Sequence, residues 1–450
     1  MKLGQTIFRV GYMYDGERFL SPCEIYIRDG VVERIVEDSD RSPEADALRR
    51  QYSEADQVHE PDGFVLPGLI NSHHHAYSAL ARGMAIRGPR PDFQAVLERL
   101  WWPLDRALDP EAVYLSALVT AIESVRHGCT AIVDHHSSPS AIQGSLVQVA
   151  RAFSDLNLTA TLCYETSDRN GAKAFDQSLE ENLTFAEAHR KDTALRGMFG
   201  LHASFTLSDR SLKRIAEIRP QYLPVHVHVA EDRADVEHAQ DLGHDGPLAR
   251  LDACGLLDES SLIAHGVHLT EDECKLAADV GLHVAHNPES NLNNAVGYSS
   301  LDKLPPDKVL LGTDGMSSSM LASLHSAYLT YSGMGGTGDG LERARRILLD
   351  NPSAYLTRLF GRPVGRIVEG EPADLAMFVY RPPTPVTGDN WIGHLLFGLS
   401  ISARAIWVYA RGTPVLARGA IQTIDEASVL AAARESTAAL WDRYREIAGA

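Results

Sequence analysis

The sequence predicts an α/β protein: a (β/α)8 TIM barrel with a small composite β-sandwich domain built from both chain ends. Three observations lead to this prediction. Apolar runs alternate with helical segments through the middle of the chain, these runs end on polar residues, and both chain ends read as short alternating strands. The 450 residues leave room for one large domain and one small one.

The eight predicted barrel strands are continuous apolar runs, as expected for parallel strands covered on both faces. A polar rim follows them, and in a barrel this rim carries the active site. An open doubly wound sheet would gather such residues only at its switch point, so the pattern favours the barrel. The strands lie at about 64–72, 129–135, 158–164, 197–201, 223–228, 261–265, 281–286 and 308–313, and the rim residues are His73, His75, Asp134, His135, Glu165, His202, His228, His265, His286 and Asp314.

The two chain ends are expected to pair with each other. The stretch EIYIRDGVVERIVED alternates apolar and polar residues around the turn Asp29-Gly30, and AIWVYARGTPVLARGAIQ near the other end alternates in the same way. We expect residues 1–63 and 362–425 to form the small β-sandwich domain, residues 64–361 the barrel, and residues 426–450 a terminal helix. The polar stretch 38–60 is expected to be a loop or an excursion.

Two helices have clear boundaries in the sequence. Asp109-Pro110 supplies an N-cap and a proline at the first helical position, and Gly128 follows the expected end of that helix. Thr270 and Glu273 form a capping box that begins a second helix.

Composition excludes several classes of protein. The net charge of −18 disfavours binding to nucleic acid and to anionic membranes. No apolar run reaches the roughly 18 residues of a membrane span, and the first residues lack the apolar core of a signal peptide. The five scattered cysteines form no CxxC pair and fit a reducing compartment. We therefore expect a cytoplasmic protein.

The triple histidine at residues 73–75 predicts half of a metal site. Residues i and i+2 of a strand face the same side, so His73 and His75 can chelate one ion while His74 points away. The fifth strand offers His226 and His228, of which His228 lies nearer the rim, and Asp314 ends the eighth strand. Three imidazoles and one carboxylate suit Zn²⁺, with Fe²⁺ or Mn²⁺ as alternatives. The fourth strand has no lysine that could bridge two metals, which favours a single ion.

A divalent ion at this rim would supply a nucleophile. It lowers the pKa of bound water from about 15.7 toward about 7. Glu231, three residues after His228, could shuttle protons, and His265 could hydrogen-bond the attacking water. The sequence contains neither the HExxH motif of zincin proteases nor the PCxxC partner found in cytidine-type deaminases.

The motifs PGLINSHHH, HVHVAED, IAHGVHL, HNPESN and GTDG, in this order, resemble the amidohydrolase superfamily. More narrowly, they resemble its mononuclear deaminase and chlorohydrolase branch, which includes guanine deaminase and the triazine hydrolases. Longer stretches such as HHHAYSALARGM and HNPESNLNNAVG are similar to the SsnA-type aminohydrolases of that branch. One departure is HNPES, where relatives often have HCPxS.

The resemblance implies roles for particular residues. The metal would be held by His73, His75, His228 and Asp314, with Glu231 as proton shuttle and with His265 and Asp314 steering the attacking water. His202 would contact the substrate. The resemblance also implies a homodimer. Further substrate contacts are expected at Tyr77, Glu165, Arg169, Asn287 and Asn291.

These residues predict a deaminase that acts on an aminated heterocycle such as a purine, pterin or triazine and releases ammonia. Loss of chloride or an alkylamine from a related ring is a second hydrolytic reading, but those leaving groups need less protonation, so Glu231 favours ammonia. A barrel that only binds a metal or metabolite is a third reading. Mere binding would require neither Glu231 nor His265.

Overall fold

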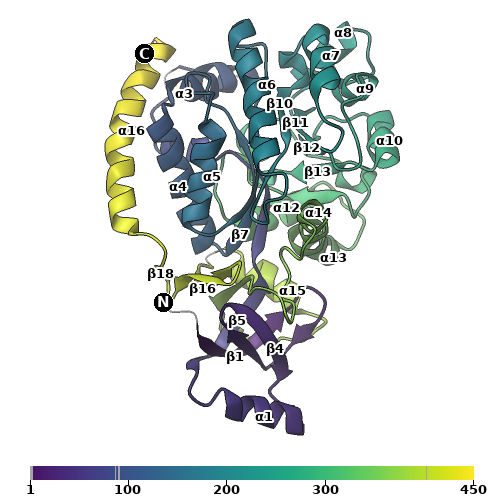
Figure 1. Cartoon of the computed structure of the whole chain (residues 1–450). Helices are drawn as coiled ribbons and strands as arrows, with labels where there is room; N and C mark the ends of the chain where they lie inside the picture. Colours follow the sequence, from purple (N-terminus) through teal and green to yellow (C-terminus); the bar gives the residue numbers. More distant parts are fainter. Residues whose placement is uncertain (1–3, 87, 90–91, 402, 450) are drawn as a thin grey trace.

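A computed structural model describes residues 4–86, 88–89, 92–401 and 403–449. A barrel of parallel strands surrounded by helices forms the upper part of the molecule in Figure 1, and a strand-rich part that combines strands from the N-terminal and C-terminal regions of the chain lies below it. The α/β barrel and the composite sheet predicted from the sequence are therefore confirmed.

The barrel fills its eight strand positions in chain order, and the fourth position is split into two short strands. Hydrogen bonds join these strands into a four-stranded and a five-stranded sheet, and neighbouring strands in both sheets are parallel. The strands are β6 (Leu69–His74), β7 (Cys129–His136), β8 (Thr159–Tyr164), β9 (Leu195–Gly197), β10 (Phe199–Ala203), β11 (Val225–Val229), β12 (Leu262–His265), β13 (His283–His286) and β14 (Val309–Leu311).

The barrel closes at two seams between these sheets. A bridge between Thr166 and Leu201 joins the β8 and β10 sides, and a bridge between His74 and Asp314 joins the first strand to the end of the last. At the second seam the backbone N–H groups of residues 313 and 314 both donate to the His73 carbonyl, at 3.0 and 2.9 Å. A Cβ at Gly312 would lie only 3.0 Å from the His73 Cβ, so glycine permits this approach. The seam places Asp314 beside the histidine pair.

Helices surround the barrel, and the predicted boundaries are confirmed. The Asp109 side chain accepts a hydrogen bond from the Ala112 N–H, and Thr270 and Glu273 form the expected capping box. The helices around the barrel are α4 (Pro110–Arg126), α5 (Ser145–Asp155), α6 (Gly171–Ala188), α7 (Asp209–Ile218), α8 (Arg233–Asp241), α9 (Pro247–Ala253), α10 (Glu271–Val280), α11 (Pro288–Asn293), α12 (Met320–Gly333), α13 (Gly340–Arg345) and α14 (Asn351–Phe360).

Helix α14 closes the amino-terminal end of the barrel. Its residues Tyr355, Leu356 and Phe360 are buried in one apolar cluster with residues of the barrel strands, including Ile70 and Leu310. The Tyr355 hydroxyl donates to the Ser260 carbonyl, just before β12. This end of the barrel is therefore sealed by packing, and any opening must lie at the other end.

Strands from the two chain ends form one mixed nine-stranded sheet with its own apolar core. Its order is β18-β17-β16-β15-β5-β1-β3-β4, with β2 paired to β1, and the β1–β5 pair is parallel. The predicted hairpin turn at Asp29-Gly30 is confirmed, since both residues have positive φ angles of 49° and 82°. The strands are β1 (Gln5–Tyr14), β2 (Phe19–Leu20), β3 (Cys23–Arg28), β4 (Val31–Glu37), β5 (Asp56–Pro67), β15 (Leu375–Val379), β16 (Ala405–Ala410), β17 (Thr413–Ala417) and β18 (Ala420–Ile421).

Residues 38–72 differ in detail from the sequence prediction. The stretch 38–60 contains helix α1 (Pro43–Gln51), capped by the Ser42 side chain, and the first residues of β5. The predicted run 64–72 is divided at Gly68, because residues 64–67 finish β5 and the barrel begins at Leu69. The division into 1–63 with 362–425, 64–361 and 426–450 stays a prediction.

The last helix, α16 (Glu426–Ala448), lies alongside α4 and α3 (Trp102–Ala107), as Figure 1 shows. The Trp441 ring N–H donates to the Leu80 carbonyl at 2.9 Å, which ties the predicted terminal helix to the segment after the first barrel strand. That segment contains the turns η1 (Ala76–Ala81), α2 (Phe93–Val96) and η2 (Leu97–Trp101). Within the described residues, none of the helices combines the length and apolarity needed to span a membrane.

Candidate active site

The triple histidine lies at the carboxyl end of β6 and alternates as predicted. The rings of His73 and His75 lie on the same side, with centroids 4.9 Å apart. The His74 ring instead faces the closing seam, where its Nδ1 lies 3.0 Å from the Thr313 hydroxyl. All three are at most 6% exposed, so the strand delivers two buried imidazoles to one place.

The predicted metal ligands meet at the centre of this rim. The Nε2 atom of His75 lies 3.1 Å from that of His228 and 2.9 Å from Asp314 Oδ1. His73 Nε2 lies 3.4 Å from the same carboxylate oxygen. Donor atoms of His73, His228, His265 and Asp314 also lie within 4.8 Å of one another. Nitrogen and oxygen lone pairs gathered this closely suit a cation.

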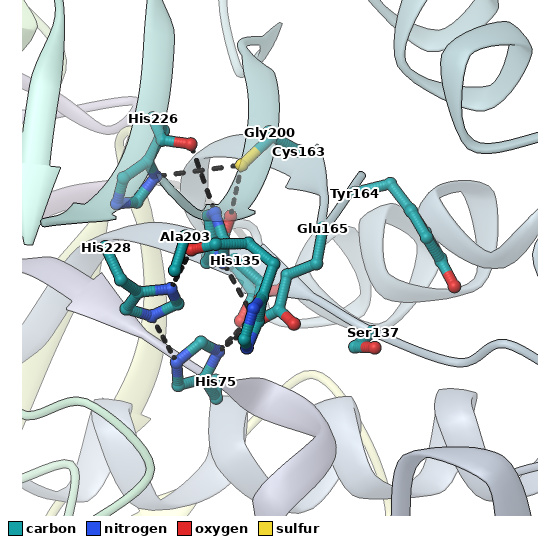
Figure 2. A network of polar contacts seen from close by, with 12 residues as sticks. His75, His135, Ser137, Cys163, Tyr164, Glu165, Gly200, Ala203, His226 and His228 are labelled. Atoms are coloured by element: carbon teal, nitrogen blue, oxygen red, sulfur yellow. Dashed lines mark hydrogen bonds and ion pairs between the residues drawn. The ribbon is translucent and has the colours of Figure 1, made fainter. Parts of the chain in front are cut away.

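Backbone carbonyls fix the orientation of two of these rings. The Nδ1–H of His75 donates to the His135 carbonyl at 2.5 Å, and the Nδ1–H of His228 donates to the His202 carbonyl at 2.6 Å. When such a ring is neutral, its one proton is on Nδ1 and the lone pair stays on Nε2. Figure 2 shows the two rings facing each other through these atoms.

The backbone is strained around the same point. Ala230, His265 and Asp314 have positive φ angles of 51°, 74° and 53°, which non-glycine residues rarely adopt. Each follows or ends a barrel strand. Such residues cost about 1–3 kcal/mol each and cluster at functional sites.

Glu231 lies next to this centre, as the motif predicted. Its Oε2 is 3.5 Å from His265 Nε2, and its Oε1 accepts a hydrogen bond from the Asn294 side chain at 3.3 Å. The Nδ1 of His265 lies 2.9 Å from Asn291 Oδ1, so it carries the ring proton and His265 Nε2 faces Glu231 as an acceptor.

Burial and the nearby Asp314 carboxylate together raise the pKa of Glu231 to about 7, against the opposing effect of His265. A carboxyl group with a pKa near neutrality can take up and release a proton with similar ease. Glu231 therefore has the position and the acidity expected of a proton shuttle.

A cavity leads from the cluster to the surface between α2, η2 and the loops after β8, β10 and β11. Candidate catalytic groups line it together with a group of aromatic and apolar side chains that pack against one another. The lining residues are His75, Tyr77, Phe93, Leu97, Trp101, Trp102, Asp105, Glu165, Arg169, His202, Ala203, Phe205, His228, Glu231, Asp232, Asp235, Asn294 and Asp314.

His202 lines this cavity and is held by the first turn after β10. Its Nδ1 lies 3.0 Å from the Thr206 hydroxyl, whose own proton goes to the Ala203 carbonyl. The ring proton is therefore on Nδ1, and Nε2 is an acceptor. Burial, helped by Arg169, lowers the pKa of His202 to about 3, so the ring is neutral.

Glu165 and Arg169 also line the cavity, where they contact each other and Asp105. An Arg169 Nη2 atom lies 3.2 Å from an Asp105 oxygen and 3.8 Å from a Glu165 oxygen, and the guanidinium lies over the Trp102 ring. The other Glu165 oxygen lies 3.0 Å from His135 Nδ1 (Figure 2). His135 and the other nearby imidazoles hold the pKa of Glu165 well below its usual range, against the effect of burial.

Two of the predicted substrate contacts lie elsewhere. Asn287 and Asn291 are buried and are not among the residues that line the cavity. Both follow β13, where the chain turns into α11, and Asn291 contacts His265 instead of open space. Tyr77, in contrast, lines the cavity between His75 and Trp101.

Sequence reasoning missed several lining residues. Asn294, which contacts Glu231, lies three residues beyond Asn291 in the run NLNN. Phe93 and Leu97 share a face of the segment after β6, and their spacing of four residues was the available signal. Asp105 and Phe205 carried no comparable pattern: Asp105 lies within α3, and Phe205 lies in the short helical turn after β10.

Comparison with known proteins agrees with this geometry. Residues 64–400 match the Amidohydrolase family. The chain belongs to that family. It is 28% identical to a 5-methylthioadenosine/S-adenosylhomocysteine deaminase of Moorella thermoacetica, over 82% of this chain and 86% of the relative. It is 30% identical to a 5′-deoxyadenosine deaminase of Methanoregula boonei, over 79% of this chain and 80% of the relative.

Among solved structures, an adenosine deaminase of Xanthomonas campestris with bound zinc superposes with a TM-score of 0.81. The alignment covers 98% of this chain and 99% of that one, at 23% sequence identity. The likeness extends through both the barrel and the terminal sheet, so this member of the amidohydrolase family shares its whole architecture with a solved relative.

Proposed function

We propose that this amidohydrolase is a metal-dependent deaminase that hydrolyses an exocyclic amine of a nitrogen heterocycle and releases ammonia. One observation carries the proposal: His75, His228, Asp314 and Glu231 line a single cavity, and the buried His265 lies 3.5 Å from Glu231 Oε2. A site that only bound a metabolite would need no such proton-transfer pair beside the cluster.

The residues of this rim fit one divalent ion, and zinc is our first choice. We propose His73, His75, His228 and Asp314 as its ligands. The Nε2 atoms of His73 and His265 are buried without a hydrogen-bond partner, which is costly unless an ion or water satisfies them. When bound, such an ion lowers the pKa of a coordinated water toward neutrality and so supplies a nucleophile.

The remaining chemistry belongs to side chains of this chain. Glu231 takes the proton released from the attacking water at Oε2 and delivers it to the ring nitrogen next to the attacked carbon. Glu231 then takes the proton of the newly added hydroxyl group and delivers it to the amine, so that the ring carbonyl forms as the bond to nitrogen breaks and ammonia leaves. His265, held by Asn291 through Nδ1, orients the attacking water with its free Nε2. Proton transfer of this kind is worth about 10²–10⁴ in rate.

We infer that the substrate is a purine carrying an apolar or neutral substituent, with pterins and triazines as the other ring types to test. The three relatives described above act, by name, on adenosine compounds. Aromatic and apolar side chains such as Trp101, Trp102 and Phe205 line the cavity and suit a flat ring with a substituent. The neutral His202 offers an acceptor for a ring N–H.

The electrostatic character of the cavity supports a substrate without negative charge. Among the lining residues that the structure describes, Arg169 is the only lysine or arginine, and its guanidinium lies beside Asp105 and Glu165. The carboxylates that line the cavity are Asp105, Glu165, Glu231, Asp232, Asp235 and Asp314. A phosphorylated substrate would therefore find no unpaired cationic side chain among these described residues.

Two finer assignments are also proposals. On the motifs around residues 73–84 and 286–297, we place the chain in the SsnA-type group of aminohydrolases. We also propose a homodimer.

The test is ammonia release from a panel of purines, purine nucleosides, pterins and aminotriazines by the zinc-loaded protein. The proposal predicts turnover of at least one aminated ring, and turnover that disappears when the metal is removed. Release of chloride or an alkylamine from ring analogues, without any ammonia release, would assign the other hydrolytic reading. Metal binding without turnover of any compound would contradict an enzymatic role.

A further inference from the structure

One ring of the cluster is held differently from its neighbours. The Nδ1 atoms of His75 and His228 face backbone carbonyls, which can only accept a proton. The Nδ1 of His73 instead lies 2.9 Å from Nε2 of another imidazole, His226, two residues before His228 on β11. Because an imidazole nitrogen can donate or accept, this contact does not by itself decide where the proton lies.

The position of that proton decides whether His73 can bind a metal. With the proton on His73 Nδ1, its Nε2 keeps a lone pair that points toward Asp314 and His75. With the proton on His226 Nε2, a neutral His73 carries its own proton on Nε2 and cannot ligate. The metal-binding form therefore needs His226 Nε2 to be an acceptor, which requires the proton of His226 to be on Nδ1.

Cys163 lies at that second nitrogen. Its sulfur is 3.7 Å from His226 Nδ1 and 3.7 Å from the Asp134 carbonyl, as Figure 2 shows for the first of these contacts. A thiol that donates to the carbonyl presents sulfur lone pairs to the His226 Nδ1–H. Cys163, His226 and His73 are all 0% exposed, so no solvent molecule competes for these protons.

We propose that Cys163 and His226 are positioning residues that keep the proton of His73 on Nδ1 and so leave its Nε2 free for the metal. The order of donation runs from His73 Nδ1 to His226 Nε2, and from His226 Nδ1 to the Cys163 sulfur. The inference rests on the proposed metal centre but names residues that do not touch the ion. Side chains that hold the second nitrogen of a metal-bound histidine typically change metal affinity about 10–100-fold when removed.

A neighbouring group of three residues, His135, Cys163 and His226, does not form a second metal site. Donor atoms of His135, Cys163 and His226 lie within 4.8 Å of one another. However, His135 Nε2 faces the His226 carbonyl at 3.2 Å, so it carries a proton and has no lone pair to offer. With His226 Nε2 also bound to His73, this cluster is better described as a hydrogen-bonded layer beneath the metal centre.

The test compares zinc affinity in four proteins: the wild type, His226→Leu, His226→Gln and His283→Leu. Apo protein is titrated against a chromophoric chelator, which gives the zinc Kd and the stoichiometry without any activity assay. Glutamine can place its amide oxygen where His226 Nε2 lies and accept the same proton, whereas leucine cannot. His283 is a matched control, because it is also a buried barrel histidine but packs against Tyr355 at the opposite end.

We expect His226→Leu to weaken zinc binding about 10–100-fold. We expect His226→Gln and His283→Leu to stay within a few-fold of the wild type. Wild-type affinity in His226→Leu would overturn the inference, as would equal losses in the leucine and glutamine variants or in His226→Leu and His283→Leu. If the wild type itself took up no zinc, the proposed metal centre would fail instead.

Cys163→Ala supplies a second, milder variant in case His226→Leu does not fold, as judged by the melting temperature of the apo protein. It removes the acceptor for His226 Nδ1 and leaves every imidazole in place. We expect a measurable loss of zinc affinity, smaller than that of His226→Leu. An unchanged zinc Kd in a folded Cys163→Ala protein would exclude the sulfur from the arrangement.

Discussion

The two ends of the barrel are built from the same strands but from opposite chemistry. At the amino end, Leu356 and Phe360 of α14 pack into an apolar cluster that continues through the strands. At the carboxyl end, the rings of His75, His226 and His228 all lie 4.9–5.0 Å from the ring of His73. One end is stabilised by packing, and the other is held in a costly arrangement that a cation would relieve.

This difference teaches where each kind of substitution should act. The amino end should contribute mostly to the free energy of unfolding, because its cluster is apolar and contains none of the proposed metal ligands. The carboxyl end contains strained residues, buried carboxyl groups and unpartnered nitrogens, so its substitutions should change metal binding, rate or pH dependence. Four predictions test this separation.

The largest effect is expected for His228→Ala. Removing one imidazole from the proposed ligand set should abolish stoichiometric metal binding and reduce ammonia release below detection. This loss of rate is larger than the roughly 10²–10⁴-fold loss expected when a proton shuttle is removed. Metal content after dialysis and rate are the two measurements. Full metal occupancy in this variant would show that another residue, with His226 the nearest candidate, supplies the ligand.

Glu231→Gln should separate chemistry from metal binding. We expect it to keep the metal and lose at least about 10²-fold in kcat, because glutamine cannot carry the proton. Glu289→Gln is the control, since Glu289 is a neighbouring half-buried carboxyl group that does not line the cavity. Normal turnover by Glu231→Gln would remove Glu231 from the mechanism.

Leu356→Ala should affect the opposite end alone. Leu356 is fully buried, and such truncations destabilise by about 2–5 kcal/mol through lost transfer energy and a residual cavity. Denaturant unfolding measures this loss. The metal stoichiometry and the kcat of the folded protein should stay at wild-type values, and a large fall in either would mean that the two ends are coupled.

The smallest effect is a pH dependence of stability at the carboxyl end. Burial raises the pKa of Asp235 to about 7. The backbone N–H groups of Ala230 and Phe205 donate hydrogen bonds to this carboxyl group, which favours its ionised form and opposes the effect of burial. The folded protein therefore binds more protons than the unfolded chain between about pH 4 and pH 7. Stability falls as pH rises through that range, because the buried carboxyl group must ionise.

Asp235→Asn removes the part of the pH dependence of stability that comes from this carboxyl group. The free energy of unfolding of the wild type, relative to the variant, should decrease from pH 5 to pH 8 by roughly 2–3 kcal/mol. The difference in the free energy of unfolding between the wild type and Leu356→Ala should show no such trend, because leucine does not titrate and both proteins contain Asp235. A constant difference between wild type and Asp235→Asn across this range would contradict the raised pKa.

The sequence was informative wherever one strand or one helix end determines position. Strand alternation placed His73 and His75 on one side, and capping residues placed the ends of α4 and α10. Residues whose positions depend on how several elements pack together were harder to predict. Asn291 was expected in the cavity, but its position depends on how α11 packs against β12, and it contacts His265.

The arrangement beneath the metal centre could not be predicted from the sequence at all. Cys163 gave no signal, because a lone cysteine within a buried strand is most often a packing residue. His226 was visible only as an unused alternative to His228. Its contact with His73 appears once the barrel has closed, since the two residues are 153 positions apart in the chain.

The most direct test of the account is a metal titration of the apo protein with ammonia release followed at each addition. We predict that activity on an aminated ring rises linearly and reaches its maximum at one zinc ion per chain, and that His73→Ala and His75→Ala show neither binding nor recovery. Full activity in the metal-free protein, or a maximum at two ions per chain, would contradict a single ion held by His73, His75, His228 and Asp314.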